Sequence, residues 1–252
     1  MSETLIIPEQ FRGPPASGNG GYVAGAIAER FPASPGAPED AATEVTLRAP
    51  IPLDTPMTLD CRAESHLRLT LNGQLIVEAE PVRMTLTVPE PPSLDAALAA
   101  RGRSAALQPR LNSLIPGGTG FHPVCVCCGA DVNEREGLRV FAAPVPGFDG
   151  VAAAWRPHPA FADDAGCLPE RLVWTALDCP GQFAWLAAGI RTGLLGRITA
   201  RVLRPVPVDS DYLVIGWCQE VERRKHFAGT ALLDPDGVLY AWSRQTWIGR
   251  MD

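Results

Sequence analysis

The feature that most constrains the fold of this chain is an internal repeat. Residues 48–54 (RAPIPLD) resemble residues 203–209 (LRPVPVD), 155 positions further on. A run that alternates between apolar and polar residues, as a half-buried strand does, follows each copy at residues 57–62 and 212–217. The chain is therefore predicted to contain two related structural units.

Each predicted unit also carries one apolar helix and one hairpin. The helices are expected at residues 20–29 (GGYVAGAIAE) and 180–188 (PGQFAWLAA), and both are apolar nearly all round, as a buried helix must be. Hairpin-turn signals lie at residues 71–76 (LNGQLI) and 234–239 (DPDGVL). Each unit is thus expected to run from a helix into antiparallel strands.

A buried helix followed by half-buried strands requires a sheet that curls around the helix, which is the α+β hot-dog fold. A lone unit would expose a sheet edge, so two units in one chain are expected to pair as a pseudo-dimer, a double hot-dog. We expect an N-terminal unit at residues 1–90, a linker rich in proline, glycine and alanine at 91–120, and a C-terminal unit at 121–252.

Composition excludes several classes of protein. The chain of 252 residues is 46% hydrophobic and carries a net charge of −6, so it offers no basic field for nucleic acid or for anionic membranes. Its first residues lack a signal peptide, and no window is apolar enough to span a membrane. We therefore expect a cytoplasmic protein whose seven cysteines are free thiols.

Three of the cysteines form a cluster at Cys125, Cys127 and Cys128, with His122 three positions before the first. The Cys-x-x-Cys spacing is compatible with zinc or redox chemistry, but a second ligand pair at finger spacing is missing. The interpretation favoured from the sequence is an inert or structural thiol loop, and neither a metal nor another cofactor is expected.

The glycines at the two helix starts are candidates for substrate binding. Asn19, Gly20 and Gly21 precede or open the first helix, and Gly181 is expected near the start of the second. Uncovered amides at a helix start favour a developing oxyanion, such as that of a thioester carbonyl under attack. The same glycines also suit a tight turn and close packing, and the sequence leaves both interpretations open.

Asp178 stands just before Pro180, so two roles are open for it as well. Asp is a preferred N-cap residue, and proline is tolerated in the first helical turn. Alternatively, a carboxylate at the electropositive end of a helix inside an apolar cleft can activate water.

Three separated segments resemble the type-II acyl-CoA thioesterases, which carry two hot-dog units in one chain. Asp178 lies in LDC, Thr199 in TARVLRP and Gln245 in AWSRQ, in the order that the family shows. The resemblance implies that these three side chains hold the water that attacks the thioester. Taken singly, Thr199 also suits an ordinary strand position and Gln245 a solvent-facing one. Residues 200–203 depart from the family, which has aromatic and histidine residues there.

The resemblance implies an acyl-CoA thioesterase that hydrolyses a fatty-acyl thioester in a cleft between the units, with acyl-CoA as its partner and a homodimer of double hot-dogs as its assembly. Two rivals remain. A hot-dog hydratase or dehydratase would use an Asp/His pair, and no histidine lies near Asp178 in the sequence. A non-catalytic acyl-thioester-binding protein would keep the cleft without turnover.

Overall fold

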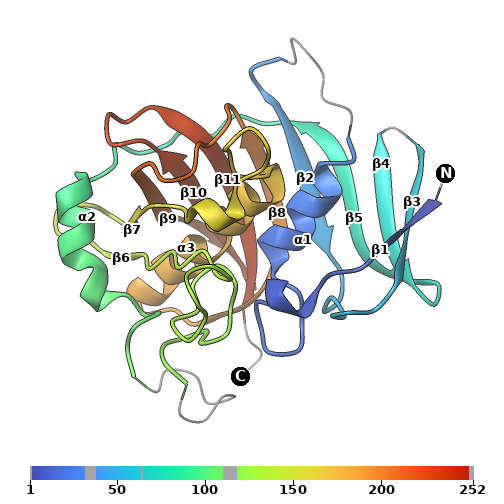
Figure 1. The fold of residues 1–252 in the computed structure, drawn as a ribbon, viewed down its shortest axis with the longest axis horizontal. Coiled ribbons are helices and arrows are strands. Elements are labelled where there is room, and N and C mark those ends of the chain that lie inside the picture. Colours follow the sequence, from blue (N-terminus) through green and yellow to red (C-terminus); the bar gives the residue numbers. More distant parts are fainter. Residues whose placement is uncertain (1, 32–37, 64, 110–117, 250–252) are drawn as a thin grey trace.

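The computed structural model describes residues 2–31, 38–63, 65–109 and 118–249, and within them one antiparallel sheet curls around two helices (Figure 1). Its strands are β1 (Ser2–Leu5), β2 (Ala41–Leu47), β3 (Met57–Ala63), β4 (His66–Leu71), β5 (Gln74–Arg83), β6 (Ala143–Pro144), β7 (Val151–Trp155), β8 (Thr192–Val202), β9 (Tyr212–Glu222), β10 (Lys225–Leu233) and β11 (Leu239–Gly249). The helices are α1 (Gly20–Ala28), α2 (Leu94–Ala100) and α3 (Glu170–Ala187). Within the described residues, none of the helices is long and apolar enough to cross a membrane.

The sheet consists of two halves joined edge to edge. Its strand order is β1-β3-β4-β5-β2-β8-β11-β10-β9-β7-β6, so every strand up to β5 lies in one half and every strand from β6 onward lies in the other. The junction is the antiparallel pair β2–β8, in which Val45 is opposite Ile198. Pairing within one chain covers an edge that a single unit would expose. The predicted α+β double hot-dog is therefore the observed architecture.

Local signals placed the first helix and the hairpins correctly. Helix α1 begins at Gly20, where the side chain of Asn19 accepts a hydrogen bond from the backbone N–H of Tyr22. Asn72 and Gly73 join β4 to β5 with φ angles of 50° and 82°. Both residue types tolerate this left-handed region, which two-residue hairpin turns require.

The prediction for the second helix was wrong in its start. Helix α3 begins at Glu170, ten residues before Pro180, which lies inside the helix. A proline within a helix removes one backbone hydrogen bond and normally ends or bends it. Here the sheet supplies extra bonds beside the proline, because Thr230 donates to the carbonyl of Leu177 at 3.0 Å. Asp178 is consequently a mid-helix residue and does not cap α3.

The stretch that was predicted as a linker contains helix α2 and a short 3-10 helix at Arg101–Arg103. Ala97 and Ala100 of α2 are buried in the same cluster as Trp217 and Trp242, on the face of the sheet opposite to α3. Residues 110–117 of the predicted linker lie outside the described residues.

Helices α1 and α3 touch along a face of glycines. A Cβ atom added to Gly21 would lie 2.5 Å from the carbonyl oxygen of Trp174, and one added to Gly25 would lie 2.6 Å from the Cα atom of Arg171. Both distances are shorter than real contacts, so only glycine permits this approach. The two units thus share one core, in which the helix of one is packed on the helix of the other.

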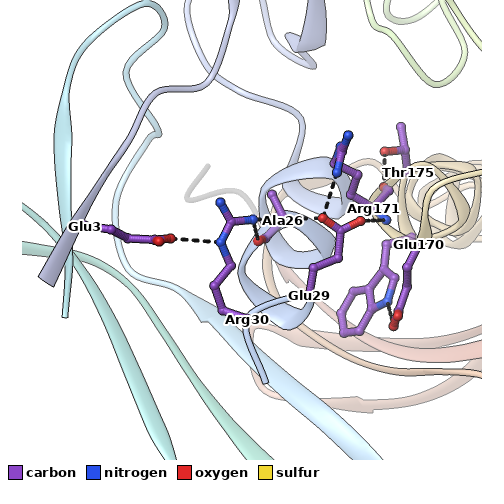
Figure 2. A network of polar contacts seen from close by, with 8 residues as sticks. Glu3, Ala26, Glu29, Arg30, Glu170, Arg171 and Thr175 are labelled. Atoms are coloured by element: carbon purple, nitrogen blue, oxygen red, sulfur yellow. Dashed lines mark hydrogen bonds and ion pairs between the residues drawn. The ribbon is translucent and has the colours of Figure 1, made fainter. Parts of the chain in front are cut away.

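An ion pair fixes the ends of the two helices relative to each other (Figure 2). At the end of α1, the carboxylate of Glu29 accepts from the backbone N–H of Arg171 at 2.9 Å and from its guanidinium at 2.8 Å. The next residue, Arg30, donates to the carbonyl of Ala26 and to Glu3. Because Glu29 binds an N–H group in the first turn of α3, its charge also interacts favourably with the positive end of that helix.

The glycine face leads to a first prediction. Alanine favours helix over glycine by about 1 kcal/mol, but in Gly25→Ala the new methyl group must displace the backbone of α3, at a cost of about 1–3 kcal/mol or more. We expect a net loss of at least about 1 kcal/mol in the free energy of unfolding by urea. Gly102→Ala is the matched control, because no atom lies within 4 Å of its added Cβ. Equal stability of the two variants would contradict the proposed contact.

A second prediction concerns Glu170 beside this ion pair. Burial raises the pKa of Glu170, and the charge of Glu29 raises it further. A carboxyl group whose pKa is higher in the folded state opposes folding once it ionises. The free energy of unfolding therefore falls as the pH rises above the pKa of this group in the unfolded chain, about 4.3. Glu170→Gln should therefore raise the melting temperature at neutral pH, with a gain that shrinks towards pH 4. A gain that stayed constant with pH would show that packing is the cause.

Candidate functional site

A cavity of about 360 Å³ lies between the two units. Its wall combines the loop before α1, the end of β2 and the loop that follows, the middle of α3, the start of β8, the end of β11, and two residues of the loop before β6. These are residues 13, 14, 17–20, 47–51, 122, 125, 178, 179, 182, 193–196 and 247–249. The volume and the mostly apolar lining are typical of a small-molecule site.

Asp178 is the buried carboxylate in this cavity. It is only 3% exposed, and its Oδ2 atom accepts from the backbone N–H of Gly21 at 2.9 Å. Burial raises the pKa of Asp178 to about 7, against the lowering effect of hydrogen bonds from Gly21, Asn19 and Gly20, while negative charge at Cys125 would raise it further. Asp178 thus lies at the positive end of a helix, as expected, but this helix is α1 of the other unit.

Asn19 is held in one orientation. Its Oδ1 atom accepts from Tyr22, so the amide nitrogen Nδ2 faces the cavity, where it approaches Cys125 Sγ at 3.7 Å. A thiol sulfur is a weak acceptor, so an oxygen atom of a molecule in the cavity can replace Cys125 as the partner of Nδ2. Gly20 lies beside Asn19 in the wall.

The predicted oxyanion amides are arranged differently from the expectation. The N–H of Gly21 is directed at Asp178. Gly181 lies inside α3, away from any helix start, and a Cβ atom there would be 1.9 Å from Oε1 of Gln245. Gly181 is small because Gln245 packs against it, and it is not part of the cavity wall.

Gln245 on β11 supports Asp178 from behind. Its side chain is fully buried and donates to the carbonyls of Leu177 at 2.5 Å and of Asp178 at 3.1 Å. Its Oε1 atom accepts from the indole N–H of Trp247 at 2.8 Å. All polar groups of the amide are directed at protein atoms, so Gln245 holds the backbone of the site and does not face the cavity.

Thr199 is not brought to Asp178. Its hydroxyl donates to Glu44 at 3.2 Å, and Glu44 forms an ion pair with Arg197. Side chains alternate between the faces of a strand, and the neighbour Ile198 belongs to the core around the helices. Thr199 thus lies on the opposite face of the sheet, at the junction of the two halves.

Gln182 of the wall was not predicted from the sequence, and His122 was noted there only beside the cysteine cluster. The Nε2 atom of His122 is 2.7 Å from Oε1 of Gln182, whose Nε2 atom donates to the carbonyl of Gly193 at 2.9 Å. Gln182 follows Asp178 by four positions, a spacing that puts both on one face of a helix and could have indicated it. No local signal places His122 there, because a long loop brings it in.

Cysteines complete the wall. Cys125 and Cys179 line the cavity with their sulfur atoms 3.7 Å apart, and Cys128 lies behind them. Hydrogen bonds from Cys128 and Cys179 lower the pKa of Cys125. The thiol loop of the sequence analysis is therefore part of the site.

Comparison with solved structures identifies the fold. The tesB protein of Mycobacterium avium subs paratuberculosis is 12% identical, with a TM-score of 0.59 over 99% of this chain and 93% of that one. The acyl-CoA thioesterase II TesB2 of Mycobacterium marinum is 13% identical, with a TM-score of 0.52 over 100% and 93%. A protein of unknown function with a hot dog fold from Alicyclobacillus acidocaldarius is 11% identical, with a TM-score of 0.54 over 100% and 94%.

These likenesses span nearly the whole chain, so the resemblance to double hot-dog thioesterases is confirmed at the level of the fold. No protein-family profile and no curated protein sequence matches the chain.

The structural role of Gln245 can be tested by measuring the stability of a variant. Gln245→Met keeps the approximate volume but leaves the buried indole N–H of Trp247 without an acceptor, which costs about 1–3 kcal/mol. We expect the free energy of unfolding to fall by that amount. Gln219→Met, on the exposed side of β9, should stay within about 0.5 kcal/mol of the native protein. Similar losses in both variants would argue against the buried role.

Proposed function

We propose that the protein is a thioester hydrolase that cleaves acyl-CoA in the cavity between its two units. The observation that carries this proposal is the position of Asp178, a carboxylate at the wall of an apolar cavity and at the N-terminus of α1. The fold shared with a structure described as an acyl-CoA thioesterase II supports the same reaction class.

The cavity suits an acyl chain better than a polar substrate. Leu47, Ile51 and Leu195 line it, and Leu194 stands in its wall with 54% of its surface exposed. Burial of each methylene group of an acyl chain contributes about 0.8 kcal/mol. A fatty-acyl group can therefore hold the thioester next to Asp178 by apolar contact alone.

Asp178 and Asn19 supply the chemistry. Asp178 accepts a proton from a water molecule as the water oxygen forms its bond to the acyl carbon. The amide nitrogen of Asn19 donates to the carbonyl oxygen, on which negative charge develops. The carbon–sulfur bond then breaks, and the thiolate of coenzyme A takes the proton back from Asp178. Gln245 keeps the backbone of Asp178 in place during these steps.

The site also favours a second candidate, a hot-dog hydratase or dehydratase. That reaction uses an Asp/His pair, and the loop before β6 brings His122 into the cavity that Asp178 lines. The sequence has no histidine near Asp178, but the fold brings His122 into the wall of the same cavity. Incubation with an enoyl-CoA distinguishes the candidates, because a hydratase forms a hydroxyacyl-CoA while a thioesterase releases free thiol.

The cellular setting is part of the proposal. All seven cysteines are unpaired, which is typical of a reducing compartment, and we place the protein in the cytoplasm. A homodimer of double hot-dogs remains the proposed assembly.

The decisive experiment compares thiol release from a series of acyl-CoAs by native protein, Asp178→Asn and Thr199→Val. Loss of the carboxylate should lower kcat by at least about 10²-fold, because the amide cannot accept the proton. Thr199→Val should retain activity, since its hydroxyl binds Glu44 on the other face of the sheet.

Two outcomes would contradict this assignment. Undiminished activity in Asp178→Asn would show that Asp178 takes no part in the reaction. Loss of activity in a folded Thr199→Val would show that Thr199 acts in the reaction, as the family resemblance implies. Ligand-induced thermal stabilisation without turnover in the native protein would identify an acyl-thioester-binding protein.

A further inference from the structure

Three sulfur atoms from two distant segments converge beside the cavity. The Sγ atoms of Cys125, Cys128 and Cys179 all lie within 4.8 Å of one another, and all three residues are buried. Cys125 and Cys128 come from the loop before β6, and Cys179 comes from the middle of α3. Two of these cysteines line the cavity, but the proposed hydrolysis gives none of the three sulfur atoms a role, so their convergence requires its own explanation.

The spacing of the sulfur atoms fits metal ligands. A disulfide would hold two sulfur atoms about 2.05 Å apart, whereas Cys125 and Cys179 are 3.7 Å apart. A tetrahedral zinc ion with zinc–sulfur distances of about 2.3 Å separates its sulfur ligands by about 3.8 Å. The pair is thus already placed for a common ion without any covalent bond between the two residues.

The loop that carries two of the ligands is preorganised. The N–H of Gly129 donates to the carbonyl of Cys125 at 2.7 Å, which closes the Cys-x-x-Cys segment into a tight turn. A Cβ atom at Gly129 would lie 2.5 Å from that carbonyl oxygen, so the turn requires glycine. The middle of the segment is also held in place, because the N–H of Leu138 donates to the carbonyl of Val126 and the N–H of Val140 donates to that of Cys127.

The surroundings provide two further features of a metal site. The side-chain amide of Asn19 approaches Cys125 Sγ at 3.7 Å, as donors around thiolate ligands do. Cys125 and Cys179 line the cavity, which gives an ion a path to the sulfur atoms and room for a water molecule as a fourth ligand. Within the described residues, no further Cys, His, Asp or Glu ligand atom joins the three at that distance.

We propose that Cys125, Cys128 and Cys179 bind one zinc ion that ties the loop before β6 to helix α3 beside the cavity. Zinc suits three thiolates and tolerates a water molecule as its fourth ligand. Binding replaces three thiol protons by one ion and joins segments 51 or more positions apart in the sequence, so it stabilises the folded chain. This site goes beyond the proposed hydrolysis and departs from the metal-free expectation of the sequence analysis.

The test measures metal directly. Protein purified under reducing conditions should contain about one zinc ion per chain by mass spectrometry, as expected for a single site. Replacement by Co²⁺ should produce a thiolate-to-cobalt charge-transfer band in the near ultraviolet. Cys125→Ser, Cys128→Ser and Cys179→Ser should each lose the stoichiometric zinc and weaken that band. Removal of zinc by a chelator should lower the melting temperature of the native protein.

Cys127→Ser is the matched control. Cys127 lies in the same turn and is equally buried, but its sulfur is not one of the three that lie within 4.8 Å of one another. We expect this variant to keep zinc and the cobalt band, with its fold checked by circular dichroism. The native protein with its metal reversibly removed and restored supplies the same readout if a serine variant does not fold.

The proposal fails if the native protein binds neither ion in stoichiometric amount, or if the three serine variants keep the metal. It also fails if Cys127→Ser loses the metal to the same extent, because metal binding would then depend on an intact loop and not on the three sulfur atoms. A Cys125–Cys179 disulfide in peptide mapping without reductant would overturn it in favour of redox chemistry. None of these readouts depends on thioester hydrolysis.

Discussion

The close contact between α1 and α3 is the constraint on which the site depends. Gly21 and Gly25 carry no side chain, so the backbone of α1 lies directly on Trp174 and Arg171 of α3. At this separation the first amide groups of α1 reach the side chain of Asp178, a residue of the other unit. A larger residue at either glycine would separate the helices and remove the hydrogen bond that holds the carboxylate. Packing and chemistry therefore rest on the same two positions.

Two opposing effects act on the Asp178 carboxylate. Removal from water disfavours its charge, and this effect dominates, since the pKa rises to about 7. The amide of Gly21 and the side chain of Asn19 act in the opposite direction, because their hydrogen bonds favour the ionised form. A buried carboxyl group without such donors would stay neutral to a higher pH. The helix end of one unit thus keeps the acid of the other unit close to the range in which it can exchange a proton.

The sequence predicted what local patterns determine and missed what tertiary packing determines. The repeat, helix α1, the turn at Asn72 and Gly73 and the double hot-dog follow from periodicity and turn chemistry, and the structure confirms them. The start of α3 was misplaced because Pro180 is a helix-breaking signal, and hydrogen bonds from distant strands override it. The order of residues along the chain also could not show on which face of β8 Thr199 lies. Strand register decides that question.

The middle of α3 explains why the site can exist only in the assembled chain. Asp178, Cys179 and Gln182 all face the cavity, and each contacts a different segment. Asp178 accepts from α1, Cys179 meets the loop before β6, and Gln182 joins His122 to β8. Without these partners, a carboxylate, a thiol and an amide buried on one helix would each lower the stability of the fold. These partners come from both halves of the chain. Because the two units lie in one polypeptide, their sequences can differ, so that one unit supplies the N-terminus of α1 and the other supplies the reactive side chains of α3.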